Sequence, residues 1–224
     1  MKFYFNSSVL KKPAFYTSAS ILFIALLGLT LMRNPGGLPP FDKDNGGLTF
    51  PDGFGAVVVV DTLGPARHLA INNNGDIYVK LRFSPKGGNV ALRDTDNDGK
   101  ADIIQHFGDY KDVGSLANGM RIHKGYLYYS SSLAIYRNKL SPGKLIPDSP
   151  METILTDDHG HGAHWHITKP MEFDDKGFMY VPFGTPSNNC MDMNNTPGGK
   201  PGQPGLNPCP ELEQHAGIWK FDAS

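Results

Sequence analysis

Three related stretches decide the fold: LAINNNGDIYV at residues 69–79, MRIHKGYLYY at 120–129 and MEFDDKGFMYV at 171–181. Their first residues lie 51 and 51 positions apart. Each stretch has an alternating apolar run, a glycine turn of the N-G or K-G kind that hairpins use, and a second run with a tyrosine. The glycines are Gly75, Gly125 and Gly177, and the tyrosines are Tyr78, Tyr128 and Tyr180. We therefore predict three related β-hairpins.

Further strand candidates follow each hairpin. They are NVALRD at 89–94, ADIIQHF at 101–107, LAIYRNKL at 133–140, METILTD at 151–157 and GIWKFDAS at 217–224. Four short strands recurring about every 50 residues are typical of propeller blades. The alternative is a β-sandwich with unrelated hairpins. We predict an all-β chain with a propeller of four-stranded blades, about three of which are present.

The amino-acid composition agrees with an all-β fold and argues against a nucleic-acid partner. The 26 glycines and 18 prolines make the chain of 224 residues rich in turns. Lysine and arginine total 21 against 22 acidic residues, so the formal net charge is -1. Without a basic surface, no nucleic-acid partner is expected.

The number of blades is too small for a closed ring. Propellers close with about 4 to 8 blades, and an open set leaves sheet faces and edges uncovered. The sequence therefore predicts either the N-terminal portion of a larger propeller or a subunit completed by a partner chain.

The N-terminus carries a targeting segment at residues 1–33. Lysines precede an uncharged run at 13–32, predicted as an apolar helix, and Arg33 ends it. Its dense part, residues 21–32, suits the core of a cleaved signal peptide, whereas the whole run could just cross a membrane as an uncleaved anchor. We favour the anchor, because no clear cleavage site follows. Either reading exports the rest of the chain.

A linker and a short strand follow. Residues 34–52 are rich in Gly, Pro and Asp, with too little apolar periodicity to pack alone. AVVVVD at 56–61 has the pattern of a buried strand. The partial propeller is therefore assigned to residues 53–224.

Cys190 and Cys209 flank a segment rich in Gly, Pro and Asn. Export favours a disulfide between them, which would restrict a loop that cannot order itself. Two unpaired thiols are the alternative reading.

Two clusters could bind metal ions. His159, His161, His164 and His166 could hold zinc or copper, line a cavity or lie on a solvated loop. Asp94, Asp96 and Asp98 match the start of a calcium loop, but Gln105 replaces the glutamate that an EF-hand needs. A structural calcium in a blade turn and a turn satisfied by its own side chains stay open.

Five blocks together resemble the glucose/sorbosone dehydrogenase family, exported six-bladed propellers that use pyrroloquinoline quinone (PQQ) and calcium, and are most similar to its sorbosone-dehydrogenase-like branch. They cover most of residues 53–224. The blocks are ARHLAINNNGDIYVKLR (66–82), NVALRDTDNDGKADIIQHFG (89–108), GYLYYSSSLAIYR (125–137), HITKPMEFDDKGFMYVPFGTPSNNC (166–190) and NPCPELEQHAGIWKFD (207–222). The resemblance implies half of a six-bladed ring in the periplasm.

The resemblance also implies site residues. The family's catalytic histidine precedes a hairpin glycine by 18 residues, as His166 precedes Gly184. His166 would then be the general base, a task that suits imidazole because its ordinary pKa is about 6.5. The pocket for substrate and cofactor would include His164, Trp165, Thr185, Arg67 and His68.

The chain departs from the family in three ways. Thr185 stands where the soluble enzymes have an aspartate that orients the histidine. The family's glutamine contact to PQQ has no clear counterpart near Ala117 and Asn118. Its arginine, lysine and calcium contacts lie in later blades.

Two functions follow as hypotheses. The first is PQQ-dependent oxidation of a sugar or aldose-like substrate, with electrons passed to an acceptor. The second is a non-catalytic propeller that binds carbohydrate or protein partners.

Overall fold

The computed structural model describes residues 37–82, 88–108, 119–157, 166, 168–185, 187, 190, 205–213 and 215–223. The predicted targeting segment and its apolar helix lie outside these residues. In the part that is described, no helix is both long and apolar enough to cross a membrane. The chain divides into two units, Met1–Pro39 and Pro40–Ser224, and the predicted boundaries at residues 33 and 52 stay predictions.

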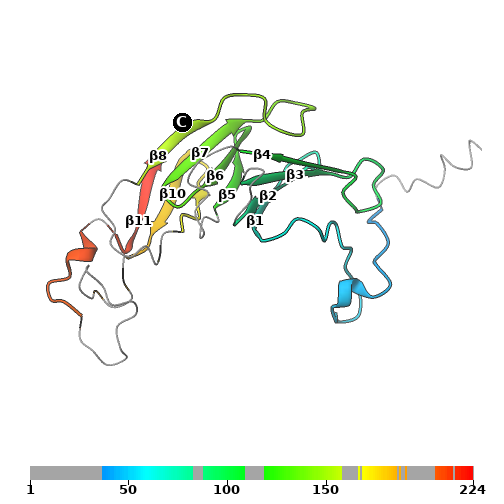
Figure 1. The fold of residues 1–224 in the computed structure, drawn as a ribbon, viewed down its shortest axis with the longest axis horizontal. Helices are drawn as coiled ribbons and strands as arrows, with labels where there is room; N and C mark the ends of the chain where they lie inside the picture. Colours follow the sequence, from blue (N-terminus) through cyan, green and yellow to red (C-terminus); the bar gives the residue numbers. More distant parts are fainter. Residues whose placement is uncertain are drawn as a thin grey trace, which may run out of the picture. The chain divides into compact units, whose positions relative to one another are not determined.

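The second unit is built from antiparallel sheets that we call blades, in chain order (Figure 1). Blade 1 contains β1 (Ala66–Ile71), β2 (Ile77–Leu81), β3 (Asn89–Arg93) and β4 (Ile103–Phe107). Blade 2 contains β5 (Met120–His123), β6 (Tyr126–Ser130), β7 (Ala134–Lys139) and β8 (Glu152–Thr156). Blade 3 contains β9 (Glu172–Phe173), β10 (Phe178–Phe183) and β11 (Gly217–Asp222). Two short 3-10 helices, η1 (Asn45–Gly47) and η2 (Pro210–Leu212), lie in the connections.

The predicted hairpins are confirmed, and glycine is required at each turn. The φ angles of Gly75, Gly125 and Gly177 are +91°, +78° and +94°, a region that side chains with a Cβ rarely adopt. The second hairpin is tighter than the others. Lys124 also has a positive φ, so both central residues have the left-handed conformation of a type I′ turn.

Two of the repeated tyrosines show how each sheet packs on the next. Tyr78 is fully buried between blades 1 and 2, and its hydroxyl donates to the Leu145 carbonyl at 3.0 Å. Tyr128 occupies the matching position between blades 2 and 3, against Met179 and Val181. Each tyrosine thus faces the next blade along the chain. This serial packing of one sheet on the next is that of a propeller, and it excludes the two-layered sandwich.

Blade 3 has three strands within the described ranges. Its sheet runs in the order β11-β10-β9, so β11 is an edge strand with no further partner within the described ranges. No residue of β11 is fully buried, whereas β3, the equivalent strand of blade 1, is buried at four of its five positions.

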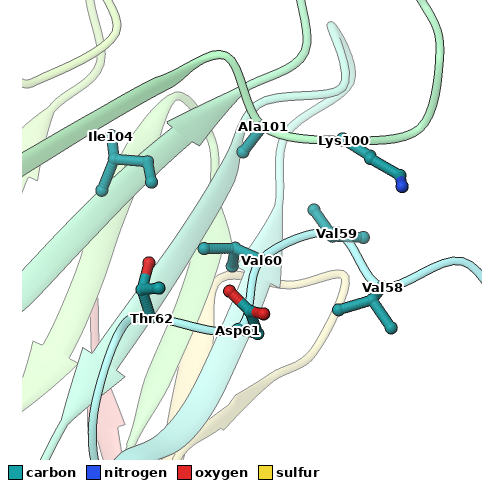
Figure 2. Close-up of a pocket in the computed structure, with 8 residues that line it drawn as sticks. All are labelled: Val58, Val59, Val60, Asp61, Thr62, Lys100, Ala101 and Ile104. Atoms are coloured by element: carbon teal, nitrogen blue, oxygen red, sulfur yellow. The ribbon is translucent and has the colours of Figure 1, made fainter. Parts of the chain in front are cut away.

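The strand predicted at 56–61 is wrong. Its contact with blade 1 includes a single backbone hydrogen bond, from the Ala101 N–H to the Val59 carbonyl at 3.0 Å. On the other side, the Val58 N–H donates to Asp42 Oδ2 at 2.7 Å. The segment does not become a strand (Figure 2), because no strand in the described part of the chain is aligned with it. Val60 and Leu63 instead cover the outer apolar cluster of blade 1.

The disulfide prediction is confirmed. Cys190 and Cys209 are bonded, with Cα atoms 5.8 Å apart. Beside the bridge, the Leu206 N–H donates to the Cys190 carbonyl at 2.8 Å. The bond joins the segment after β10 to the segment before β11, so both ends of the connection are held next to blade 3.

Replacing both cysteines with serine should lower the free energy of unfolding by about 3 kcal/mol, because the unfolded chain regains the freedom of a loop of about 20 residues. Chemical denaturation with and without a reductant measures the effect. The reductant should weaken the parent protein to the level of the double variant and leave the variant unchanged. A reductant effect on the variant would contradict this explanation.

Candidate functional site

His166 lies against the glycine that the sequence paired with it. A Cβ added to Gly184 would come within 2.3 Å of both the Cβ and the carbonyl oxygen of His166. Only a residue without a side chain allows this approach. The spacing of 18 residues between His166 and Gly184 therefore corresponds to a direct contact in the fold.

The imidazole of His166 is exposed, and among the described residues it has a hydrogen-bond partner at Nδ1. Its Nδ1 atom lies 3.3 Å from the Thr185 carbonyl oxygen. A carbonyl can only accept, so Nδ1 carries a proton, and in the neutral form of the ring the lone pair is then on Nε2. This is the tautomer that a base acting through Nε2 requires.

Thr185 contributes its main chain to this contact, not its side chain. Its hydroxyl donates to the Ser187 carbonyl. The Ser187 hydroxyl and N–H in turn donate to the two carboxylate oxygens of Glu211, at 2.6 and 3.2 Å. Glu211 is only 2% exposed, and it therefore anchors the strand exit that presents the carbonyl to His166. Sequence reasoning missed Glu211, because nothing in its neighbourhood marks it as buried.

A buried ion pair holds the chain on both sides of the histidine-rich stretch. Lys169 Nζ lies 2.7 Å from Asp157 Oδ2, and their side chains are 2% and 3% exposed. Lys169 also donates to the Ser132 carbonyl at 2.7 Å. Its own carbonyl would be 2.2 Å from a Cβ on Gly119, so this glycine admits the segment to blade 2. Removing one partner of such a buried pair typically costs about 3 to 5 kcal/mol.

The innermost strands of all three blades are linked through Arg121. Arg121 Nε donates to Glu172 Oε2 at 2.8 Å, and Nη1 lies 2.8 Å from His68 Nε2. A guanidinium can only donate, so His68 Nε2 accepts and the imidazole is neutral with its proton on Nδ1. One residue from each of β1, β5 and β9 therefore forms a continuous polar chain.

A cavity of about 390 Å³ adjoins this chain on β1, lined by residues 66–69. The register between β1 and β2 shifts between Ala66 and His68, which makes Arg67 the bulged residue. Bulges redirect side chains and are common beside functional sites. Both pocket residues predicted on this strand, Arg67 and His68, therefore line one cavity.

Two histidines of the inner strands have pKa values below the ordinary one. Burial lowers the pKa of His68, the charge of Arg121 lowers it further, and Glu172 opposes the change. Burial likewise lowers the pKa of His123, with Lys124 adding to the effect and Asp174 opposing it. The His123 ring stacks on Phe173 at 4.3 Å between centroids. Both imidazoles are therefore held in the neutral form.

The acidic turn groups different carboxylates from those predicted. Oxygens of Asp94, Asp96 and Asp102 lie within 4.8 Å of one another, while Asp98 is not in the group. Asp98 turns aside because its carboxylate accepts from the Lys100 N–H at 2.8 Å. Asp102 joins because it accepts from the N–H and hydroxyl of Thr95, each at 2.6 Å. Backbone amides of the same turn also donate to Asp94, as expected for a self-satisfied turn.

The remaining predicted residues, His159, His161, His164 and Trp165, lie outside the described residues. The metal and cavity readings of the histidine cluster therefore stay predictions.

Comparison with known proteins tests the fold. No family model matches the chain, and no curated protein matches it. Among solved structures, the PQQ domain of pyranose dehydrogenase from Coprinopsis cinerea matches with a TM-score of 0.53 and 16% identity, covering 74% of this chain and 35% of that one. A Trichoderma reesei carbohydrate-active enzyme of family AA12 matches with a TM-score of 0.53 and 16% identity, covering 75% and 38%.

The chain folds as a partial β-propeller. At 16% identity, the similarity to these two structures shows the fold alone. For the fold, it confirms the resemblance that the sequence analysis described. The chain spans little more than a third of the length of the structures it matches.

The lowered histidine pKa values predict sensitivity to acid. In the unfolded chain these imidazoles bind protons near pH 6.5, whereas in the folded chain their lowered pKa values keep them unprotonated. The unfolded chain then binds more protons than the folded chain, so the free energy of unfolding should fall as the pH drops below about 6.5. His123→Phe keeps a ring on Phe173 and removes one titrating group, and it should reduce the loss of unfolding free energy between about pH 7.5 and 5.5. Phe173→Leu keeps the imidazole and should retain the loss. Equal losses in His123→Phe and the parent protein would contradict the assignment.

Glu211→Gln should disturb the support of His166. The new amide places an NH₂ group where one carboxylate oxygen accepts from Ser187, leaving a buried donor unpaired at a cost of about 1 to 3 kcal/mol. Thermal unfolding followed by circular dichroism measures the loss. Glu213→Gln, two residues along and exposed, is the control and should melt with the parent protein. Equal melting of both variants would show that Glu211 is not an anchor.

Proposed function

We propose that this chain takes part in PQQ-dependent oxidation of a sugar or aldose-like substrate, with His166 as the general base. The observation that carries the proposal is the geometry of His166. It is exposed, lies directly on Gly184, and has Nδ1 turned to the Thr185 carbonyl. Nε2 is therefore the atom that receives the proton of the substrate hydroxyl.

The fold supports the reaction class. Both matched structures are carbohydrate-related by their descriptions, and that of Coprinopsis cinerea is a PQQ domain of a pyranose dehydrogenase. Removing the hydroxyl proton makes the carbon–hydrogen bond a better hydride donor, so a base beside an electron-accepting quinone suits sugar oxidation. The Thr185 carbonyl orients the ring but brings no negative charge, unlike the aspartate of the soluble enzymes.

The inner strands offer a partial set of groups for the cofactor. PQQ is anionic and, when bound, supplies the site that accepts the hydride. Arg67 and Arg121 would hold its carboxylates, since guanidinium groups match carboxylate geometry. His68, kept neutral by Arg121, would donate through Nδ1. Further contacts would come from the blades that complete the ring.

The proposal also covers a calcium ion and the cellular compartment of the chain. One structure of the Trichoderma reesei protein is described as its calcium structure, and we propose calcium for this chain also, with Asp94, Asp96 and Asp102 as candidate ligands. The disulfide suits an oxidising compartment. We propose a periplasmic or other extracytoplasmic chain anchored through residues 13–32, which passes electrons to a separate acceptor.

The test is reconstitution of the full chain with PQQ, calcium, a panel of aldoses and a dye as electron acceptor. His166→Ala should lower the rate of dye reduction at least about a hundredfold, in line with the usual contribution of a general base. PQQ binding, followed by its absorbance in equilibrium dialysis, should change little.

His106→Ala on β4 provides a matched histidine control and should keep the parent rate. Dye reduction that survives in His166→Ala would rule out the proposed base. PQQ binding without dye reduction by any aldose would favour a non-catalytic binding propeller.

A further inference from the structure

The disulfide and the candidate base belong to one connected set of contacts. Cys190 comes three residues after Ser187, and Cys209 comes two residues before Glu211. The bridge therefore joins the same two segments that meet in the hydrogen bonds between Ser187 and Glu211. We propose that the bridge positions the imidazole of His166, so that reduction of the bridge by a dithiol weakens the base. This inference rests on the proposed function, in which His166 is the base.

The first link runs from the bridge to the Glu211 carboxylate. The 3-10 turn η2 follows Cys209 directly, and the Leu212 N–H donates to the Cys209 carbonyl at 3.4 Å. Glu211 lies inside this turn and is only 2% exposed. Because a single hydrogen-bonded turn separates them, the position of Cys209 determines where the carboxylate lies.

The second link runs from the carboxylate to the imidazole. Glu211 accepts from the hydroxyl and the N–H of Ser187, at 2.6 and 3.2 Å. The Ser187 carbonyl accepts from the Thr185 hydroxyl, and the Thr185 carbonyl lies 3.3 Å from Nδ1 of His166. A displacement of Ser187 therefore moves the carbonyl that selects the tautomer of the ring.

The backbone of Cys190 gives a second, independent reason for movement when the bridge opens. Its φ angle is +51°, in the left-handed region that residues with a Cβ seldom adopt. Among the described residues, the bridge and the hydrogen bond from the Leu206 N–H at 2.8 Å restrain it. Reduction removes one of these restraints, so Cys190 can relax to an ordinary conformation, three residues from Ser187.

The bridge also decides how often the contact between Ser187 and Glu211 is closed. These two residues are 24 positions apart, and the two cysteines are 19 apart. Closing a loop of about 20 residues without a cross-link lowers the population of the closed form roughly a hundredfold. In the reduced chain the hydrogen bonds of Glu211 alone oppose this change, and a buried carboxylate gains hydration when it leaves.

The chemistry of the switch is thiol–disulfide exchange. Neither Cys190 nor Cys209 is fully buried. A thiolate of the dithiol attacks one sulfur of the bridge and forms a mixed disulfide, and its second thiol then displaces the protein sulfur. The protein gains two electrons and two protons as two thiols, while the dithiol becomes a disulfide. Reoxidation restores the bridge and, with it, the support of His166.

The test reads the tautomer of His166 by nitrogen NMR of the full ¹⁵N-labelled chain in mild detergent, at about pH 8, where an ordinary imidazole is neutral. With the bridge closed, Nδ1 should have the shift of a protonated nitrogen and Nε2 that of an unprotonated one. Dithiothreitol should move both shifts to intermediate values, because a ring without a fixed partner exchanges between tautomers. The Cys190→Ser/Cys209→Ser double variant should give intermediate shifts with or without dithiothreitol.

Two further variants separate positioning from general stability. Leu127→Ala opens a cavity in the core between blades 1 and 2, far along the chain from the bridge, and destabilises the fold while the bridge stays closed. It should keep the single tautomer of the parent protein. Ser187→Ala also keeps the bridge but removes the hydroxyl that Glu211 holds, and it should give intermediate shifts.

Dye reduction by the chain loaded with PQQ and calcium provides the second measurement. Reduction of the bridge should lower kcat about tenfold or more and leave KM for the aldose nearly unchanged, because the base is misplaced while the substrate site remains. Reoxidation should restore kcat. Leu127→Ala should keep the parent kcat as long as it is folded.

The two measurements fail separately. A single tautomer in the reduced, folded chain would overturn the inference even if dye reduction depends on His166. If no aldose supports dye reduction, the proposed function fails, and the NMR shifts still decide whether the bridge positions the ring. If reduction unfolds the chain, as circular dichroism would show, Ser187→Ala decides, because an unchanged tautomer there would also overturn the inference.

Discussion

Burial of one face of each sheet against the next is the constraint on which this structure depends. Tyr78 illustrates it, since its ring fills the space between blades 1 and 2 while its hydroxyl donates to the Leu145 carbonyl. Large aromatic side chains give much of the apolar burial in such cores, and a hydroxyl that is buried needs a partner. Tyr128 repeats the arrangement one blade later. The hairpin glycines serve this packing because they fix which face of each sheet the tyrosine occupies.

The polar groups of the candidate site follow from the same arrangement. Stacking the blades brings their innermost strands together, so that His68, Arg121 and Glu172 meet although they lie far apart in the sequence. Because Arg121 donates to Nε2 of His68, the tautomer of His68 is defined, with its proton on Nδ1. At His166 the same kind of control comes from a backbone carbonyl. In both places the protein selects a tautomer with a neighbour that can only donate or only accept.

The sequence was informative where the pattern is local and less so where the partner is distant. Periodicity and turn glycines predicted the hairpins and the strands that follow them, and the cysteines predicted their bond. The valine run at 56–61 was misread, because β propensity does not reveal whether an aligned strand is available. Glu211 and Lys169 were missed because charged residues are usually exposed, and only the folded chain supplies the partners that bury them. The contact of His166 with Gly184 was anticipated by a family spacing, whereas the role of the Thr185 carbonyl required coordinates.

The ion pair between Asp157 and Lys169 also bears on where His166 lies. It joins the end of blade 2 to the start of blade 3, and Lys169 donates to the Ser132 carbonyl as well. Three residues before Lys169, His166 lies so close to Gly184 that this position has no room for a side chain. A substitution that broke the pair would leave a buried charge without its partner, and it would release one of the two points that hold the chain around this histidine. The buried pair is therefore part of the support of the candidate base, although it lies apart from the imidazole itself.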